Sequence, residues 1–206
     1  DAIASLEHSL ALDANQADLH NALGRAYERL GAVTGDEALS YPAMASYQDA
    51  INLNPRLVAA YINLGRARLT REWPRAGAPL QQALNILPES DAPSVKRQRA
   101  ELHYLLGEVA IRQGRKADAE TEFKKSLALK ADLVPAQLAL ASVYVVSNKP
   151  LAAEEAYKQA LDIASDTLDL ANVHFLYGKF LESPDHRRPF DAIAEYSAAL
   201  SLDPSN

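Results

Sequence analysis

The sequence predicts an all-α protein built from tandem helix-turn-helix repeats, and three observations lead to this fold class. The composition favours helices, because 48% of the 206 residues are hydrophobic, Ala and Leu predominate, and only eight residues are glycine. One helical phrase recurs along the chain at near-regular intervals. A second helical phrase, built on a bulky residue followed by a small one, alternates with the first.

The first phrase is clearest at the two ends of the chain, where residues 191–204 nearly restate residues 1–14. Further copies occupy residues 43–55, 76–88, 119–131 and 153–165. In each copy a small residue is followed four positions later by a bulky residue, and three positions after that by another small one. The bulky members are Leu6, Tyr47, Leu80, Phe123, Tyr157 and Tyr196. Because the spacings are three and four residues, each copy predicts a helix with one packing face.

The second phrase contains a bulky and small pair at a constant phase. The pairs are Leu23-Gly24, Leu64-Gly65, Leu106-Gly107, Leu140-Ala141 and Tyr177-Gly178. A glycine inside a helix costs roughly 1 kcal/mol relative to alanine. Its recurrence at one phase therefore predicts a close approach between two helices. Pro55, Pro88 and Pro204 are expected to end their helices.

Together the two phrases resemble the signature of the tetratricopeptide repeat, W-x2-L-G-x2-Y followed by A-x3-F and P. The resemblance covers essentially the whole chain. It implies a right-handed superhelical solenoid in which the first helix of each repeat lines a concave groove. We expect a single array over residues 1–206, with a half repeat (second helix only) at 1–14 and repeats at 17–55, 58–88, 92–131, 133–165 and 168–204.

Several segments depart from the family pattern. Residues 32–42 exceed the family's tight turn by about seven residues, which predicts a long loop between the helices of the first full repeat. Residues 89–99 add a similar excess, expected as an N-terminal extension of the next helix. Pro79 is expected to kink its helix or delay its start. Both ends of the chain resemble cut ends without a polar capping helix, so we expect a fragment of a longer protein or ends that partners cover.

Several classes of function find no support in the sequence. The chain has no cysteine, which excludes disulfides, thiolate metal sites and cysteine nucleophiles but identifies no compartment. The most apolar stretch, residues 133–146, is too short to cross a membrane. The metalloprotease, P-loop, dinucleotide and nucleophile-elbow motifs are all missing from the sequence. We therefore expect no enzyme activity, no catalytic residues, no metal, no cofactor and no membrane insertion.

The five histidines are predicted to be structural. His20, His103 and His174 share one slot in three different repeats, three residues before the bulky and small pair. This slot predicts packing between helices rather than metal binding. His8 has no ligand partner nearby in the sequence, and His186 is expected to be solvated in a loop.

The charge distribution suggests a kind of partner. The net charge is −6, but residues 56–99 are basic and both ends of the chain are acidic. The acidic total argues against nucleic acid as a partner, and the arginines of residues 66–75 have only one aromatic residue, Trp73, among them. The basic segment is either a solvated face or a cradle for an acidic peptide.

The groove expected from the resemblance selects one stripe on each first helix. The selected residues are Asn21, Arg25, Arg66, Tyr104, Glu108, Arg112, Phe175 and Lys179. They predict an extended or helical peptide partner that carries acidic residues and an apolar anchor. Apolar contacts should dominate its affinity, because an exposed ion pair contributes only about 0.2–1 kcal/mol.

The leading hypothesis is a non-catalytic scaffold for protein–protein interaction. Two alternatives stay open. The chain could be a structural module that self-associates through its uncapped ends, or the recognition arm of a larger enzyme whose catalytic domain lies elsewhere.

Overall fold

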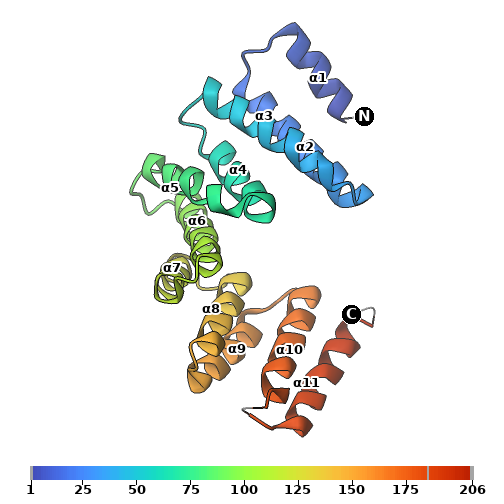
Figure 1. Cartoon of the computed structure of the whole chain (residues 1–206), viewed down its shortest axis with the longest axis vertical. Coiled ribbons are helices and arrows are strands. Elements are labelled where there is room, and N and C mark those ends of the chain that lie inside the picture. The colour runs from blue at the N-terminus through green and yellow to red at the C-terminus, as the bar shows by residue number, and fades with distance from the viewer. Residues whose placement is uncertain (1, 185, 205–206) are drawn as a thin grey trace. The chain divides into compact units, whose positions relative to one another are not determined.

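The computed structural model describes residues 2–184 and 186–204, and these residues form helices joined by short turns (Figure 1). Within this described part there are eleven α-helices and two 3-10 turns. The α-helices are α1 (Ala2–Leu12), α2 (Ala17–Thr34), α3 (Ser40–Leu53), α4 (Val58–Arg71), α5 (Gly77–Ile86), α6 (Pro93–Arg112), α7 (Lys116–Leu129), α8 (Val134–Val146), α9 (Pro150–Ile163), α10 (Thr167–Glu182) and α11 (Pro189–Leu202). The 3-10 turns are η1 (Glu37–Leu39) and η2 (Trp73–Arg75). The predicted all-α fold class is confirmed.

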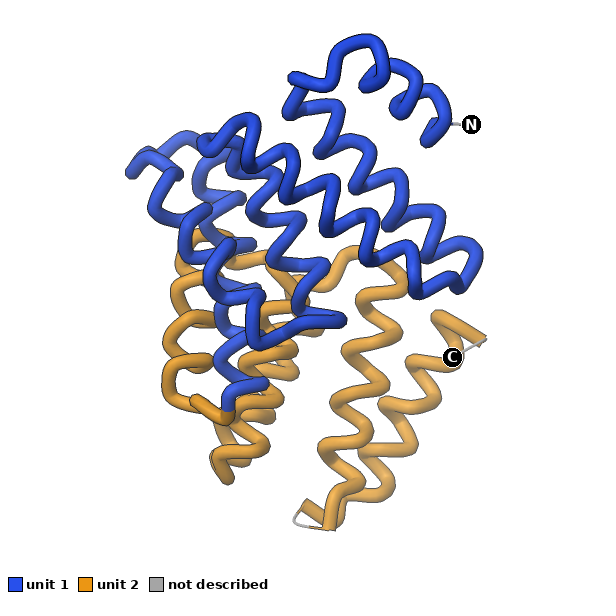
Figure 2. The backbone as a smooth tube through the Cα atoms, turned by 45° about the horizontal axis from the view of Figure 1, so that its top comes forward, with its two compact units in different colours: residues 1–113 blue, residues 114–206 orange. Residues whose placement is uncertain are grey.

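The chain divides into two compact units, residues 1–113 and residues 114–206 (Figure 2). Unit 1 contains α1 to α6, and unit 2 contains α7 to α11. Within each unit a helix packs chiefly on its neighbours in the chain, as in the hairpins α2–α3, α4–α5, α8–α9 and α10–α11. The first helices of successive hairpins also touch, α2 with α4, α4 with α6, and α8 with α10. Such nearest-neighbour packing is the organisation of a helical repeat solenoid.

Each unit has its own apolar core. In unit 1 the fully buried side chains include Tyr47, Leu64 and Leu80, which come from successive helices. In unit 2 an aromatic cluster forms where Tyr157 packs on Tyr177 and Phe180, with ring centroids 5.5 and 5.4 Å apart. Aromatic rings at such separations add to the stabilisation that burial provides. The bulky positions of the two repeated phrases therefore supply the core.

Three glycines of the second phrase, Gly24, Gly65 and Gly178, lie where two helices approach closely, as predicted. A Cβ atom on Gly24 would lie 2.5 Å from the Tyr47 ring, and one on Gly178 would lie 2.8 Å from the Tyr196 ring. A Cβ on Gly65 would overlap the side chain of Leu80. The large residue of the second helix thus packs directly on the backbone of the first.

The long loop predicted over residues 32–42 is not present. Helix α2 continues to Thr34 and ends at Gly35, which has a left-handed φ of 72°. The Asp36 side chain then accepts a hydrogen bond from the Ala38 amide at 3.0 Å and starts η1, and α3 begins at Ser40. The prediction was wrong because Ala32, Val33 and Thr34 extend the helix, so the additional residues lengthen α2 and add one 3-10 turn.

The two other departures took the predicted form. Helix α6 begins at Pro93, so most of the excess over residues 89–99 extends that helix. Helix α5 begins only at Gly77, after η2, and Pro79 lies in its first turn. The first turn of a helix contains amides without an intrahelical partner, so the missing N–H of proline costs little there.

Candidate partner-binding surface

In unit 1 the predicted stripe lies on α2, α4 and α6, and hydrogen bonds connect these three helices. The Asn63 side-chain amide donates to Asn21 Oδ1 at 2.9 Å and links α4 to α2. Arg66 forms an ion pair with Glu101 and links α4 to α6. Asn21 and Arg66 therefore already have polar partners within the unit.

The contacts of the stripe follow the repeat length. Asn21 and Asn63 are 42 residues apart, and Arg66 and Glu101 are 35 apart. Residues about one repeat apart occupy similar phases on successive first helices, so their side chains meet. Asn63 and Glu101 were missing from the predicted site. Pairing polar residues one repeat apart could have identified both.

The positive charge of Arg25 acts on the hydroxyl of the buried residue Tyr47. The Tyr47 hydroxyl donates to Glu28 Oε2 at 2.5 Å. Burial of Tyr47, together with this hydrogen bond and the charge of Glu28, raises the Tyr47 pKa far above its usual range, whereas Arg66 and Arg25 act to lower that pKa. The hydroxyl therefore stays protonated and holds Glu28, while the Arg25 side chain is exposed.

The α6 part of the stripe carries Tyr104, Glu108 and Arg112 at intervals of four residues. Burial raises the pKa of Glu108, and Arg112 partly opposes that shift. Burial, with a smaller contribution from Glu108, also raises the pKa of Tyr104. Arg112 is exposed whereas Tyr104 and Glu108 are half-buried. Of the three side chains, Arg112 is thus the one fully presented to solvent.

In unit 2 the predicted residues form an aromatic and basic pair on α10. The Phe175 side chain is 37% exposed, and its ring centroid lies 6.0 Å from that of Tyr196 on α11. The Lys179 ammonium lies 5.6 Å from the Phe175 ring centroid, within cation–π distance. Phe175 is therefore a partly exposed aromatic residue that contacts both Tyr196 and Lys179. The predicted set divides into a largely polar group in unit 1 and this pair in unit 2.

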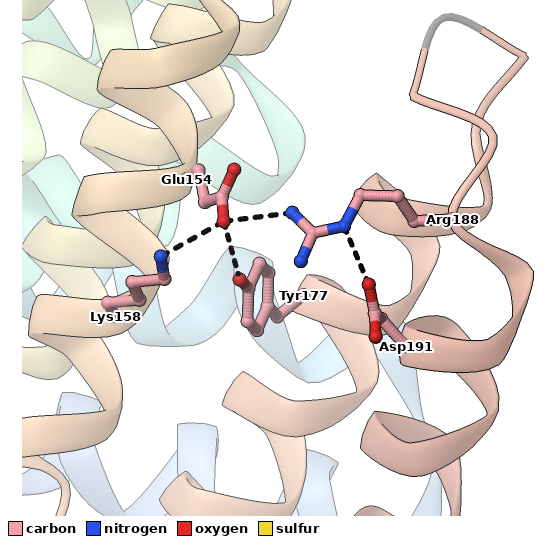
Figure 3. A network of polar contacts seen from close by, with 5 residues as sticks. All are labelled: Glu154, Lys158, Tyr177, Arg188 and Asp191. Atoms are coloured by element: carbon pink, nitrogen blue, oxygen red, sulfur yellow. Dashed lines mark hydrogen bonds and ion pairs between the residues drawn. The ribbon is translucent and has the colours of Figure 1, made fainter.

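A second polar network in unit 2 was not predicted (Figure 3). Glu154 Oε1 accepts hydrogen bonds from Arg188 at 2.9 Å and Tyr177 at 3.3 Å, and it pairs with Lys158 at 3.0 Å. Arg188 also donates to Asp191 at 2.6 Å. Lys158 and Arg188 lower the pKa of Glu154, so the carboxylate stays charged. The network joins α9, α10 and the start of α11, and the mutual satisfaction of its charges indicates a structural role.

Comparison with known proteins agrees with this architecture. A family model described as the tetratricopeptide repeat matches residues 100–133, which include the second half of α6 and all of α7. The crystal structure of PilW, described as a widely conserved type IV pilus biogenesis factor, matches with a TM-score of 0.75 and 20% identity, over 98% of this chain and 85% of PilW. Residues 100–133 thus match a tetratricopeptide repeat, and the fold of the whole chain resembles that of PilW.

Two further proteins resemble this tetratricopeptide array. YrrB, described as a TPR protein with an unusual peptide-binding site, matches with a TM-score of 0.61 and 15% identity, over 98% of this chain and 93% of YrrB. Human protein O-mannosyl-transferase TMTC3 is 22% identical over an alignment 206 residues long, which covers 96% of this chain and 21% of TMTC3. The array spans about a fifth of the length of that relative.

The histidines of the tetratricopeptide array lie mainly between helices. His103 is buried with 8% exposure, and His174 Nδ1 lies 2.6 Å from a carboxylate oxygen of Glu195 on α11. His20 Nε2 lies 3.1 Å from the Ala14 carbonyl oxygen. Among the described residues no group of three or more acidic or histidine side chains is arranged to hold a metal ion.

His186 is half-buried, so the prediction that it is solvated was wrong. Its ring centroid lies 4.0 Å from that of Phe180, and its Nδ1 atom lies 2.7 Å from Ser183 Oγ. His186, which lies in the connection between α10 and α11, thus packs on Phe180 of α10. The polar sequence around His186 gave no indication of this apolar contact.

Within residues 2–184 and 186–204, no helix combines the length and the apolar character that a membrane-spanning segment requires.

Proposed function

We propose that this array is a non-catalytic scaffold that binds a segment of a partner protein along the exposed faces of its first helices. The observation that carries the proposal is the set of exposed side chains on one face of those helices. Arg25 and Arg112 are exposed cations in unit 1, and Phe175 with Lys179 is an exposed aromatic and basic pair in unit 2. The description of YrrB as a peptide-binding TPR protein is consistent with this use of the fold.

The contacts within unit 1 refine the expected chemistry of the partner. The guanidinium of Arg66 is engaged by Glu101, so a partner carboxylate would have to displace Glu101. Arg25 and Arg112 make no ion pair within the described part of the chain, and they are the better candidates for acidic residues. Phe175 supplies the apolar anchor, which should contribute more to affinity than either exposed charge.

Quantitative capture of partners tests this surface. We expect Arg112→Glu and Phe175→Ala each to reduce the amount of partner retained from an extract of the source cells. The matched control is Arg56→Glu, which changes an exposed charge in the connection between α3 and α4. Retention equal to that of the unmodified protein in both surface variants would remove the assignment.

A second candidate function is the recognition arm of a larger enzyme. It is favoured by the alignment with TMTC3, a relative named as a protein O-mannosyl-transferase and about five times longer than the aligned segment. In that case the array selects the substrate and the reaction takes place in another domain. Transfer activity of the parent protein, measured with and without the Arg112→Glu and Phe175→Ala substitutions, tests this candidate, and an unchanged activity on a protein substrate would oppose it.

Self-association is a third candidate, favoured by an apolar stripe on α11. Phe190, Ile193 and Leu200 lie on one face of that helix and are 86%, 60% and 53% exposed. Such a stripe is a typical contact surface between helices. Light scattering at increasing protein concentration measures this directly, and a constant monomer mass would oppose self-association.

A further inference from the structure

Helix α1 covers α2 incompletely and leaves a cavity between the two helices. No residue of α1 is buried. The cavity has a volume of about 570 Å³, within the range of roughly 300–1,000 Å³ that is usual for ligand sites. Its walls are chiefly apolar, with Ile3 and Leu6 on α1 facing Leu30 and Val33 on α2.

The α2 wall of the cavity is one face of a long helix. Ala22, Ala26, Leu30 and Val33 follow one another at intervals of three and four residues, so they share a face. That face extends over about 16 Å, or three helical turns, at the usual helical rise. Leu30 is 40% exposed and Val33 is 86% exposed. The neighbouring face of α2, which includes Gly24, is occupied by α3.

Two arginines border this apolar face. Arg25 and Arg29 lie one turn apart on α2, line the cavity and are exposed. Neither forms an ion pair within the part of the chain that the structure describes. Some other arginines of unit 1 are paired, as Arg66 is with Glu101 and Arg71 is with Glu37 at 2.6 Å. An apolar cavity edged by two uncompensated positive charges is complementary to an apolar surface edged by negative charges.

We propose that the cavity between α1 and α2 binds an amphipathic helical segment of a partner protein. Its apolar stripe inserts between Leu6 and Leu30, and two acidic residues one turn apart pair with Arg25 and Arg29. This is the helix-in-groove mode of recognition. The inference rests on the proposed function in requiring a protein partner and in sharing Arg25, whereas Arg112 and Phe175 do not line the cavity.

A labelled form of the protein and two synthetic peptides test the proposal. Because the chain has no cysteine, Val33→Cys places an environment-sensitive dye at a single position beside the cavity. The probe is a helical peptide of about 16 residues with a leucine stripe and two flanking glutamates four residues apart, long enough to follow the α2 face. The second peptide has lysine in place of both glutamates. Leu151→Cys, at an 83% exposed position in unit 2, is the control for dye attachment.

The glutamate peptide is expected to shift the dye emission saturably, and the lysine peptide is expected to bind about tenfold more weakly, as two ion pairs of ordinary strength imply. Arg25→Glu combined with Arg29→Glu should reverse the preference between the peptides. Leu30→Asp should abolish binding of both, and circular dichroism should show an intact fold because Leu30 is partly exposed.

Three results would overturn the proposal: no saturable response to the glutamate peptide, equal binding of both peptides, or binding that survives Leu30→Asp. A concentration-dependent dimer that Leu30→Asp dissociates would also overturn it, because the occupant would then be a second copy of this chain. If the glutamate peptide does not bind but Phe175→Ala still reduces partner capture, only the proposed cavity site is rejected. If the peptide binds but neither Arg112→Glu nor Phe175→Ala changes partner capture, only the first-helix surface is rejected.

Discussion

At the scale of single residues, packing depends on glycines that lie opposite large side chains. The Gly65 position is filled by Leu80 of the next helix, whereas a Cβ on Gly77 would meet only Val109 Cγ1 at an ordinary 3.5 Å. These two glycines therefore tolerate a methyl group very differently, although both lie in helices.

Gly65→Ala should lower the free energy of unfolding. Overpacking usually costs about 1–3 kcal/mol, and the better helix propensity of alanine offsets roughly 1 kcal/mol of that. Urea denaturation followed by circular dichroism measures the change. Gly77→Ala is the matched control and should be nearly neutral, so an equal loss in both variants would contradict the packing argument.

Glu108 should make stability depend on pH. Burial raises its pKa in the folded state, so the folded protein holds the proton more tightly than the unfolded chain does. The associated stabilisation is complete below the unfolded pKa and is lost as pH rises through the folded pKa. Glu108→Gln should therefore be more stable than the unmodified protein at neutral pH, and the difference should shrink in acid.

Denaturation at a series of pH values tests the Glu108 prediction. The matched control is Glu89→Gln, at an exposed position in the connection before α6. A neutral-pH stability that Glu108→Gln leaves unchanged, or that both variants raise equally, would show that burial of Glu108 is not the cause.

At the scale of the helix, side-chain caps are unevenly distributed. The N-cap residues of α2, α4 and α6 make no side-chain hydrogen bond to their helices. At α10 the Asp166 carboxylate accepts from the Leu168 amide at 2.9 Å and from the Asp169 amide at 3.3 Å. Packing thus stabilises most helix starts, whereas α10 also has a side-chain cap.

Asp166→Ala should destabilise unit 2 by about 1 kcal/mol, the usual loss when an N-cap side chain is removed. The cause is the loss of two acceptor contacts at the first turn of α10. Thermal unfolding measures the effect, with Gln16→Ala as the control because Gln16 occupies the N-cap of α2 without capping it. Equal shifts of the midpoint in the two variants would contradict a capping role.

At the scale of the whole molecule, stability should be local because helices pack on their neighbours in the chain. Within each unit, most helices contact their neighbours in the chain. In a repeat array a local defect raises the opening rate of nearby helices more than that of distant ones.

Phe180→Ala removes a side chain that is 5% exposed and packs on Tyr157 and Tyr177. Such truncations cost about 3–5 kcal/mol. Hydrogen exchange should accelerate in α8 to α11 and stay unchanged in α2 to α4. Phe190→Ala, at an 86% exposed position, is the control. Uniform acceleration along the chain would show that the array unfolds as one unit.

The fold was predictable because the same two helical phrases recur along the chain, so each copy indicates the same pair of helices. Tyr47, Leu80 and Tyr157 recur at one phase, and each lies in a core position. The contacts Asn21–Asn63 and Arg66–Glu101 were not predicted. The position of a residue within the repeat shows which helix face it shares with other residues, but it does not show which polar groups meet. The separation of 34 residues between Glu154 and Arg188 shows that repeat length carries part of this information.

The other incorrect predictions, for residues 32–42 and for His186, have local causes. The segment over residues 32–42 follows Gly31 and contains Gly35, and both glycines suggest a loop, but only Gly35 breaks the helix. Gly31 continues α2 and lies close to Asp36 and Leu39. The contact of His186 with Phe180 depends on how the chain turns between two helices, and no periodic pattern extends through that turn.

The close contact of Gly24 with Tyr47 also bears on how such arrays change length over evolutionary time. A crossover inside the α2–α3 hairpin would separate the two residues, leaving either a void opposite the glycine or a clash with a larger side chain. A crossover in the connection after α3 would keep them together. Duplication and loss of sequence should therefore proceed by whole hairpins, with the breakpoints in the turns that join one hairpin to the next.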